Sequence, residues 1–175
     1  MVKRFAFLLV AVASIAALIV VVAPLRSHAA GQSAPPFVTE LPHGYRDWRW
    51  ISSAHEEGDL HSIGAVLGND IAIKAYREGK LPFPDGAIIA ALHYRHFPSQ
   101  ENNKVFGQAQ SFVPGGPTNI QFMVKDSKKY AATGGWGFGH FSTDGKPADA
   151  AFMRPCFPCH EKAKETDLVF TRYAP

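Results

Sequence analysis

Apolar and polar side chains alternate along several stretches of this chain, and the alternation predicts β-strands. Over residues 87–97, successive side chains point to opposite faces, with apolar residues on both. A period of two residues is the period of a strand. Shorter alternating runs at 119–124, 135–141 and 168–173 predict three further strands. The pattern therefore predicts a domain in which strands dominate.

Capping residues and turn residues predict short helices and loops between these strands. Asn69 is placed to cap a short helix over residues 70–78, and Asp126 to cap another that ends at residue 133. Between the two helices, the stretch 98–117 is rich in Ser, Asn, Gly and Pro, which predicts a loop. The helical content is therefore expected to be small.

The first 29 residues predict an export signal. A short positive start precedes an apolar run over 5–22, and small residues stand at the two positions that signal peptidase reads before Ala30. We expect cleavage there, although a run of this length also allows a retained membrane anchor. Both interpretations place the folded part outside the cytoplasm, in the periplasm of a Gram-negative source. Residues 30–42 are expected to be a flexible segment, followed by one domain at 43–175.

The leader also explains the basic charge of the chain. The formal net charge is +3, with 18 Lys and Arg against 15 Asp and Glu. Lys3, Arg4 and Arg26 all precede residue 30, whereas the first acidic residue is Glu40, so the mature part carries balanced charge. A protein that binds nucleic acid through phosphates needs an excess of positive charge. Nucleic acid is therefore excluded as a partner.

The two cysteines, Cys156 and Cys159, are followed at once by His160 in a Cys-x-x-Cys-His motif. This motif is the attachment signature of a c-type haem. Residues i and i+3 share one face of a helix, so both sulfurs can reach the two vinyl groups on one porphyrin edge. The adjacent imidazole would then bind the iron. We expect one covalent haem c with His160 as proximal ligand, on a helix that Asp149 caps.

Three other interpretations of the motif stay open. A structural disulfide suits an exported protein, but it gives the histidine no role. A redox-active dithiol of the thioredoxin type requires a strand-to-helix context that is not visible here. A zinc site requires a fourth ligand and usually two cysteine pairs. The haem interpretation accounts for all three residues and for the export signal.

The place of the motif in the chain separates kinds of haem protein. A small electron-carrier cytochrome c has its motif near the mature N-terminus and a methionine ligand downstream, whereas here only 15 residues follow His160 and none is Met. A four-helix haem bundle needs long helices, which the frequent glycines and prolines forbid. What remains is a strand-rich haem domain with a C-terminal attachment helix.

Five further motifs resemble the cytochrome P-460 family, whose relatives include the cytochromes c′-β. These are Gly-Tyr-Arg-Asp-Trp at 44–48, Phe-Pro-Asp-Gly at 83–86, Val-Lys-Asp-Ser-Lys at 124–128, Gly-Trp-Gly-Phe at 135–138 and Thr-Asp-Leu-Val-Phe-Thr-Arg at 166–172. The resemblance implies an α+β fold, mainly an antiparallel sheet with short helices and a C-terminal haem-attachment helix. It also implies a homodimer, and an iron whose sixth position is vacant or holds water.

One departure from the family bears on activity. The hydroxylamine-oxidising members carry a lysine bonded to the porphyrin edge, and the matching position here is Ala91. Alanine cannot form that bond, and Arg95 on the same strand face stays protonated and is a poor nucleophile. Gln121 stands where such an enzyme has a glutamate, so a proton acceptor is missing. We therefore favour a protein that binds NO or CO, or transfers single electrons; an oxidoreductase acting on hydroxylamine or nitrogen oxides is the alternative.

Two more residues are candidate haem contacts. His93 shares the strand face of Ala91, so it is a candidate distal polar group or sixth iron ligand; the alternative is a histidine at a sheet margin that meets water. Gly137 lies in the middle of three alternating glycines that leave one strand face bare. A bare face allows close approach of a flat macrocycle or of a neighbouring part of the chain.

The remaining candidates have simpler explanations. Met123 and Met153 are possible axial sulfur ligands, but both occupy positions that a core methionine would fill. His96 and His140 are expected at the surface or just outside the site. The expected partners are a small gaseous ligand or a redox protein, with membrane contact only if the leader is retained.

Overall fold

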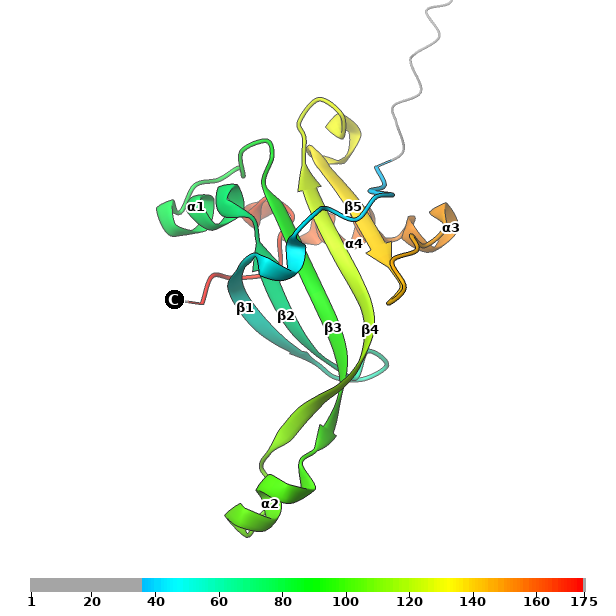
Figure 1. Ribbon diagram of the computed structural model, residues 1–175. Helices are drawn as coiled ribbons and strands as arrows, with labels where there is room; N and C mark the ends of the chain where they lie inside the picture. The colour runs from blue at the N-terminus through cyan, green and yellow to red at the C-terminus, as the bar shows by residue number, and fades with distance from the viewer. Residues whose placement is uncertain (1–35, 175) are drawn as a thin grey trace, which may run out of the picture. The chain divides into compact units, whose positions relative to one another are not determined.

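The computed structural model describes residues 36–174, so the expected signal peptide lies outside the described residues. Five strands form one antiparallel sheet in the order β1-β2-β3-β4-β5, each paired with its neighbour in sequence (Figure 1). The strands are β1 (Arg49–Glu56), β2 (Ser62–Gly68), β3 (Ile88–Pro98), β4 (Phe112–Lys125) and β5 (Trp136–Phe141).

All helices in this part of the chain are short. The α-helices are α1 (Asp70–Glu78), α2 (Gln100–Phe106), α3 (Ala150–Met153) and α4 (Cys156–His160). The 3-10 helices are η1 (Tyr45–Asp47), η2 (Ala131–Thr133) and η3 (Glu161–Thr166). Across residues 36–174, no helix has the length and apolar character needed to cross a bilayer. The α+β fold class, a mainly antiparallel sheet with short helices and a C-terminal helix, is confirmed.

Helix α1 forms where its capping residues predict it. The Asn69 side chain accepts the Ala72 N–H at 3.0 Å, and Gly79 ends the helix in the left-handed conformation, with φ 59°. The same Asn69 oxygen also accepts the Ile88 N–H at 3.1 Å. One side chain therefore both starts α1 and fixes the start of β3 beside it.

The prediction of a loop over 98–117 is wrong, because this stretch forms a hairpin that extends from the sheet. Strands β3 and β4 continue past the body of the sheet, and α2 lies at the tip between them (Figure 1). Ser99 caps α2 by accepting the Asn102 N–H. Pro114 and Pro117 lie in β4 beside shifts in its pairing with β3, where irregular pairing tolerates proline. The turn-forming residues of this stretch therefore led to a loop prediction where β4 begins.

The strand predicted over 168–173 is also wrong, and strands β1 and β2 take its place in the sheet. The C-terminal residues form no ladder; one backbone hydrogen bond joins the Ala174 N–H to the Ile51 carbonyl at 3.0 Å. Strand β2 escaped prediction because its buried face carries small residues, among them Ser62 and Gly64, in place of large apolar ones. Along β2, side chains alternate between buried and partly exposed positions, but they do not alternate between apolar and polar residues.

Two local expectations need smaller corrections. Asp126 accepts the N–H groups of Lys128 and Lys129, but the segment forms a turn that becomes helical only at η2. Residues 36–38, expected within a flexible segment, are held by β5: the Val38 N–H donates to the Phe138 carbonyl at 2.7 Å. The buried Val38 side chain belongs to a core cluster.

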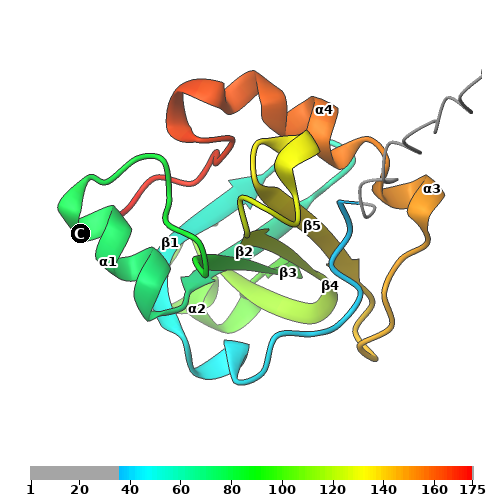
Figure 2. The same cartoon turned by 90° about the horizontal axis from the view of Figure 1, so that it is seen from above.

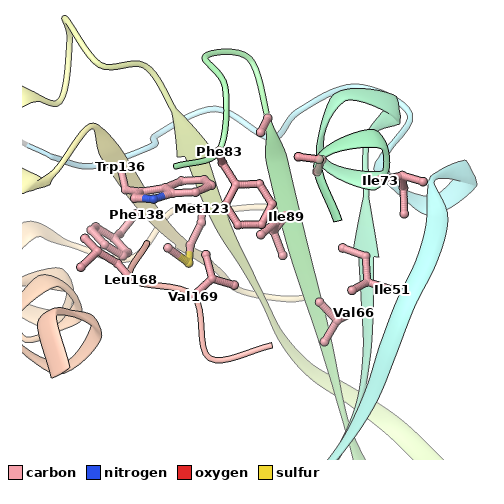
Figure 3. Packing of buried hydrophobic residues seen from close by; sticks show 13 residues of the cluster. Ile51, Val66, Ile73, Phe83, Ile89, Met123, Trp136, Phe138, Leu168 and Val169 are labelled. Carbon is pink, nitrogen blue, oxygen red and sulfur yellow. The ribbon is translucent and has the colours of Figure 1, made fainter. Parts of the chain in front are cut away.

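The sheet has a hydrophobic cluster on each face. The N-terminal stretch through η1 covers one face, and the C-terminal stretch with α4 and η3 covers the other, as the view in Figure 2 shows. On the second face, Trp136, Phe138 and Met123 of the sheet pack near Leu168 and Val169 of the C-terminal stretch (Figure 3). The residues that follow His160 are thus part of the core.

A buried ion pair holds the C-terminal stretch against the sheet. Lys125 Nζ lies 2.8 Å from both carboxylate oxygens of Asp167, and it also donates to the Gly134 carbonyl at 3.0 Å. Asp167 in turn accepts the Phe83 N–H at 2.8 Å. Both side chains are shielded, with 5% of Lys125 and 12% of Asp167 exposed. With these partners, the desolvated charges are well compensated.

The variant Asp167→Asn tests this anchor. Asparagine tolerates the left-handed backbone at this position, φ 53°, but leaves Lys125 buried and charged without its counter-ion. We expect the free energy of unfolding to fall by about 3 kcal/mol, measured by urea denaturation. The control is Glu78→Gln, which removes an exposed pair with Lys74 and should change little. Equal stability of Asp167→Asn and the unchanged protein would contradict the anchor.

Candidate functional site

The Cys-x-x-Cys-His motif lies on its own one-turn helix. Asp149 caps α3, accepting the Phe152 N–H at 2.8 Å, and α3 ends before the motif. The motif helix α4 instead begins after Pro155. The expectation that Asp149 caps the helix carrying the motif is therefore wrong, because a turn separates two short helices. Asp149 still fixes the approach to the motif.

His160 is oriented by the chain that follows it. Its Nδ1 lies 2.8 Å from the Leu168 carbonyl oxygen, so Nδ1–H is the donor and Nε2 is left with a free lone pair. This arrangement is the usual one for a histidine that binds a metal, because the second hydrogen bond fixes the tautomer and the ring plane. Burial lowers the pKa of His160, which favours the neutral imidazole.

No disulfide joins the two cysteines of the motif. Cys156 is half-buried and Cys159 is exposed. Burial raises the pKa of the Cys156 thiol. The disulfide interpretation has no support in this arrangement. Within residues 36–174 no group of three or more His, Cys, Asp or Glu side chains is arranged to hold a metal ion, so the zinc interpretation has none either.

A cavity of about 380 Å³ lies beside the motif. Cys156 and His160 of α4 line it, together with Ala91 and His93 of β3. Strands β1, β2, β4 and β5 and the stretch 169–172 complete the wall. Pockets of this size hold cofactors and ligands in many proteins. Residues 91 and 160, far apart in sequence, therefore face one cavity.

The residues around this cavity fit a haem. Nε2 of His160 is free to bind an iron, and the Cys156 thiol faces the same space. Phe138 and Met123 supply apolar contacts, with the Phe138 and His160 rings 5.0 Å apart. The pocket thus combines an imidazole nitrogen with a free lone pair, a thiol and a partly apolar wall.

His93 is buried in the wall of the cavity. It is 7% exposed, so the alternative of a histidine meeting water at a sheet margin is wrong. Its Nδ1 lies 3.4 Å from Ser62 Oγ and 3.5 Å from Glu56 Oε2. Its Nε2 has no partner among the described residues. Burial lowers the pKa of His93, and the Glu56 carboxylate opposes that shift.

Gly137 lies outside the cavity lining. A Cβ built on Gly137 would stand 2.3 Å from the nearest atom of the Tyr130 ring. The bare strand face is therefore already filled by Tyr130, which supports the packing alternative and gives no support to a haem contact at Gly137. The glycine is needed because no side chain fits between the strand and this ring.

Some of the other candidate residues line the cavity and others do not. Met123 and Gln121 line the cavity, and so does His140. Met153 does not; it is 2% exposed and buried elsewhere. His96, expected at the surface or just outside the site, is buried and packs against two further histidine rings, so the surface position is wrong; it does not line the cavity.

Sequence reasoning missed Glu56, the carboxylate beside His93. It was missed because the strand that carries it, β1, was not predicted. Its face toward the cavity carries Ser52, Ala54 and Glu56, which show no apolar alternation. The spacing of two residues along that face was the only available signal. A mostly polar strand of this kind is hard to separate from a loop by sequence alone.

The fold and site define a class: a small protein with one antiparallel sheet, whose C-terminal Cys-x-x-Cys-His helix closes a cavity over one sheet face. The family model of Cytochrome P460 matches residues 42–171. The chain belongs to the cytochrome P460 family and is a haem-binding cytochrome, which confirms the resemblance seen in the sequence. No curated protein matches the sequence.

The role of Gly137 can be tested by a double-mutant cycle. Gly137→Ala places a methyl group into the Tyr130 ring, and overpacking of this kind costs about 1–3 kcal/mol of stability. In a Tyr130→Leu background, the same change should cost much less, because the ring is gone. Thermal or urea unfolding of the four proteins measures the coupling.

The matched control for this cycle is Gly116→Ala, since nothing lies within 4 Å of a Cβ added there. The haem spectrum of Gly137→Ala should stay unchanged. An altered haem spectrum together with unchanged stability would contradict the packing role and support a haem contact.

Proposed function

We propose that this protein is an exported mono-haem c-type cytochrome. One haem is attached by thioether bonds to Cys156 and Cys159, and His160 Nε2 is the proximal iron ligand. The observation that carries the proposal is the hydrogen bond between His160 Nδ1 and the Leu168 carbonyl, which leaves Nε2 free to bind iron. The adjoining cavity, lined by the same histidine and by Cys156, supports it.

The residues of the chain act by holding and shielding this group. When bound, the haem supplies an iron that takes a small ligand or exchanges one electron. The Leu168 carbonyl keeps the His160 ring in one tautomer and one orientation. Phe138 and Phe170 flank that ring, with centroids 5.0 Å and 5.1 Å away, and limit its exposure to water. The C-terminal stretch thereby sets the position of the ligand nitrogen.

The favoured activity is binding of a small diatomic ligand such as NO, with single-electron transfer kept within the same proposal. The wall of the cavity on β3 carries Ala91, whose methyl group leaves room beside the macrocycle and can form no bond to it. Arg95 lines a neighbouring cavity and not this one, so it does not replace the missing lysine. These observations favour ligand binding over hydroxylamine oxidation.

Compartment and assembly complete the proposal. The leader suggests export to the periplasm, with a membrane anchor only if it is retained. The family resemblance suggests a homodimer. Apolar side chains gather on the extended hairpin of β3, α2 and β4, which offers a surface for a second copy of this chain; they are Phe97, Val105, Phe106, Phe112 and Val113.

The ferrous spectrum tests the proposed activity. We expect the reduced holoprotein, made with a haem-attachment machinery, to be five-coordinate and high-spin, and to bind added NO or CO in a one-to-one ratio. The physical reason is that we assign one protein ligand to the iron, His160 Nε2, and that the family resemblance implies a sixth position that is vacant or holds water. Absorption and resonance Raman spectra measure both properties.

A six-coordinate, low-spin ferrous form without added ligand would contradict ligand binding. It would instead favour electron transfer with an internal sixth ligand. The variants His93→Phe and Met123→Leu would then show which side chain fills that position. Both candidates line the cavity.

A further inference from the structure

A second cavity lies next to the haem cavity, and the two share part of one wall. The second cavity has a volume of about 470 Å³ and is lined largely by polar and charged residues, including Asp59, His61 and Arg95. Three residues line both cavities: Glu56, His93 and Gln121. These side chains therefore separate the haem cavity from a polar space.

Within this partition, Glu56 and Ser62 determine how His93 is oriented. Ser62 Oγ–H donates to Glu56 Oε2 at 3.0 Å, and His93 Nδ1 lies 3.5 Å from the same oxygen. A carboxylate only accepts, so it favours the tautomer with the proton on Nδ1. Nε2 then carries the lone pair. The orientation of an imidazole by a carboxylate on one nitrogen prepares the other nitrogen as a base.

The free nitrogen of His93 requires a partner. Nε2 is buried and has no hydrogen-bond partner in the described part of the chain. A buried polar atom without a partner costs about 1–3 kcal/mol, so native structures rarely leave one unused. Since His93 lines the haem cavity, a ligand in that cavity can supply the partner.

We propose that His93 Nε2, when protonated, donates a hydrogen bond to a diatomic ligand bound at the iron, and that Glu56 is the residue that positions the imidazole. The ligand class is a small diatomic molecule with an oxygen or nitrogen atom that can accept this hydrogen bond. The second cavity is the side from which the proton reaches His93, through Glu56. This inference rests on the proposed haem site.

Other charged and titratable groups surround the pair. His140 lines the haem cavity from β5; burial lowers the pKa of His140, and a charge on His93 lowers it further. Arg172 enters the same cavity wall from the C-terminal stretch. Around the second cavity the charged or titratable groups are Asp59, His61 and Arg95. Glu56 is the carboxylate nearest to the His93 ring, and it stabilises the imidazolium.

The C–O stretching frequency of the ferrous CO complex reports this proton directly. CO is the probe because a donor beside its oxygen lowers the stretching frequency. We expect the infrared band of the holoprotein to shift to lower frequency as the pH falls through the pKa of His93, which burial holds below its usual value of 6.5, because Nε2 then gains its proton. His93→Phe should abolish the shift. Glu56→Gln should lower its midpoint by about one pH unit, because the carboxylate that raises the pKa of His93 is gone.

Two variants control for other histidines. His96→Phe is matched, because His96 also lies on β3, is buried and has an unpartnered Nε2, but lines neither cavity. It should leave the shift unchanged. His140→Phe should retain a shift with an altered midpoint. Loss of the shift in His140→Phe but not in His93→Phe would overturn the inference.

The outcomes separate this inference from the proposed function. If CO binds but its band does not depend on pH, the role of His93 is wrong while the haem site stands. A reduced protein that is six-coordinate without CO, and becomes five-coordinate in His93→Phe, would show His93 to be an iron ligand; it would overturn this inference and the binding of a diatomic ligand, and would favour electron transfer.

Discussion

The site depends on one hydrogen bond, from His160 Nδ1 to the Leu168 carbonyl oxygen. It joins the motif helix to a stretch that forms no strand of its own and is held to the sheet mainly by side chains. The Lys125–Asp167 ion pair fixes the residue just before Leu168, and Val169 packs into the core just after it. The orientation of the metal-binding ring is therefore set by burial and charge pairing on the sheet, and not by α4 itself.

Three of the five short motifs that resemble the family meet at this anchor. Asp167 of the last motif binds Lys125 of the third and the N–H of Phe83 in the second. Asp85 accepts from both the N–H and the hydroxyl of Ser127, each at 2.7 Å. Residues that appeared as separate weak signals in the sequence thus contact one another in one part of the structure. Their role is to hold the chain that orients His160.

The sequence predicted those parts whose signal is local. Helix α1 and its cap at Asn69, the core of β3 and the Cys-x-x-Cys-His motif are local signals, and the sequence showed them. Strand β1 was not predicted because its face toward the cavity is polar. Glu56, the partner of His93, lies on this strand and was therefore missed as well. The need for glycine at position 137 comes from the Tyr130 ring that packs against it, and no local sequence pattern reveals this contact. The features that the sequence did not predict are therefore those that depend on contacts between residues far apart in the chain.

The central claim is that two sulfurs attach one porphyrin to this chain with His160 at its iron. Its most direct test is the intact mass of the denatured holoprotein, together with the alkaline pyridine spectrum of the same sample. The account predicts the mass of the chain plus one haem, a c-type chromophore that survives denaturation, and loss of both when Cys156 and Cys159 are replaced by alanine. A denatured chain without added mass or chromophore would contradict it.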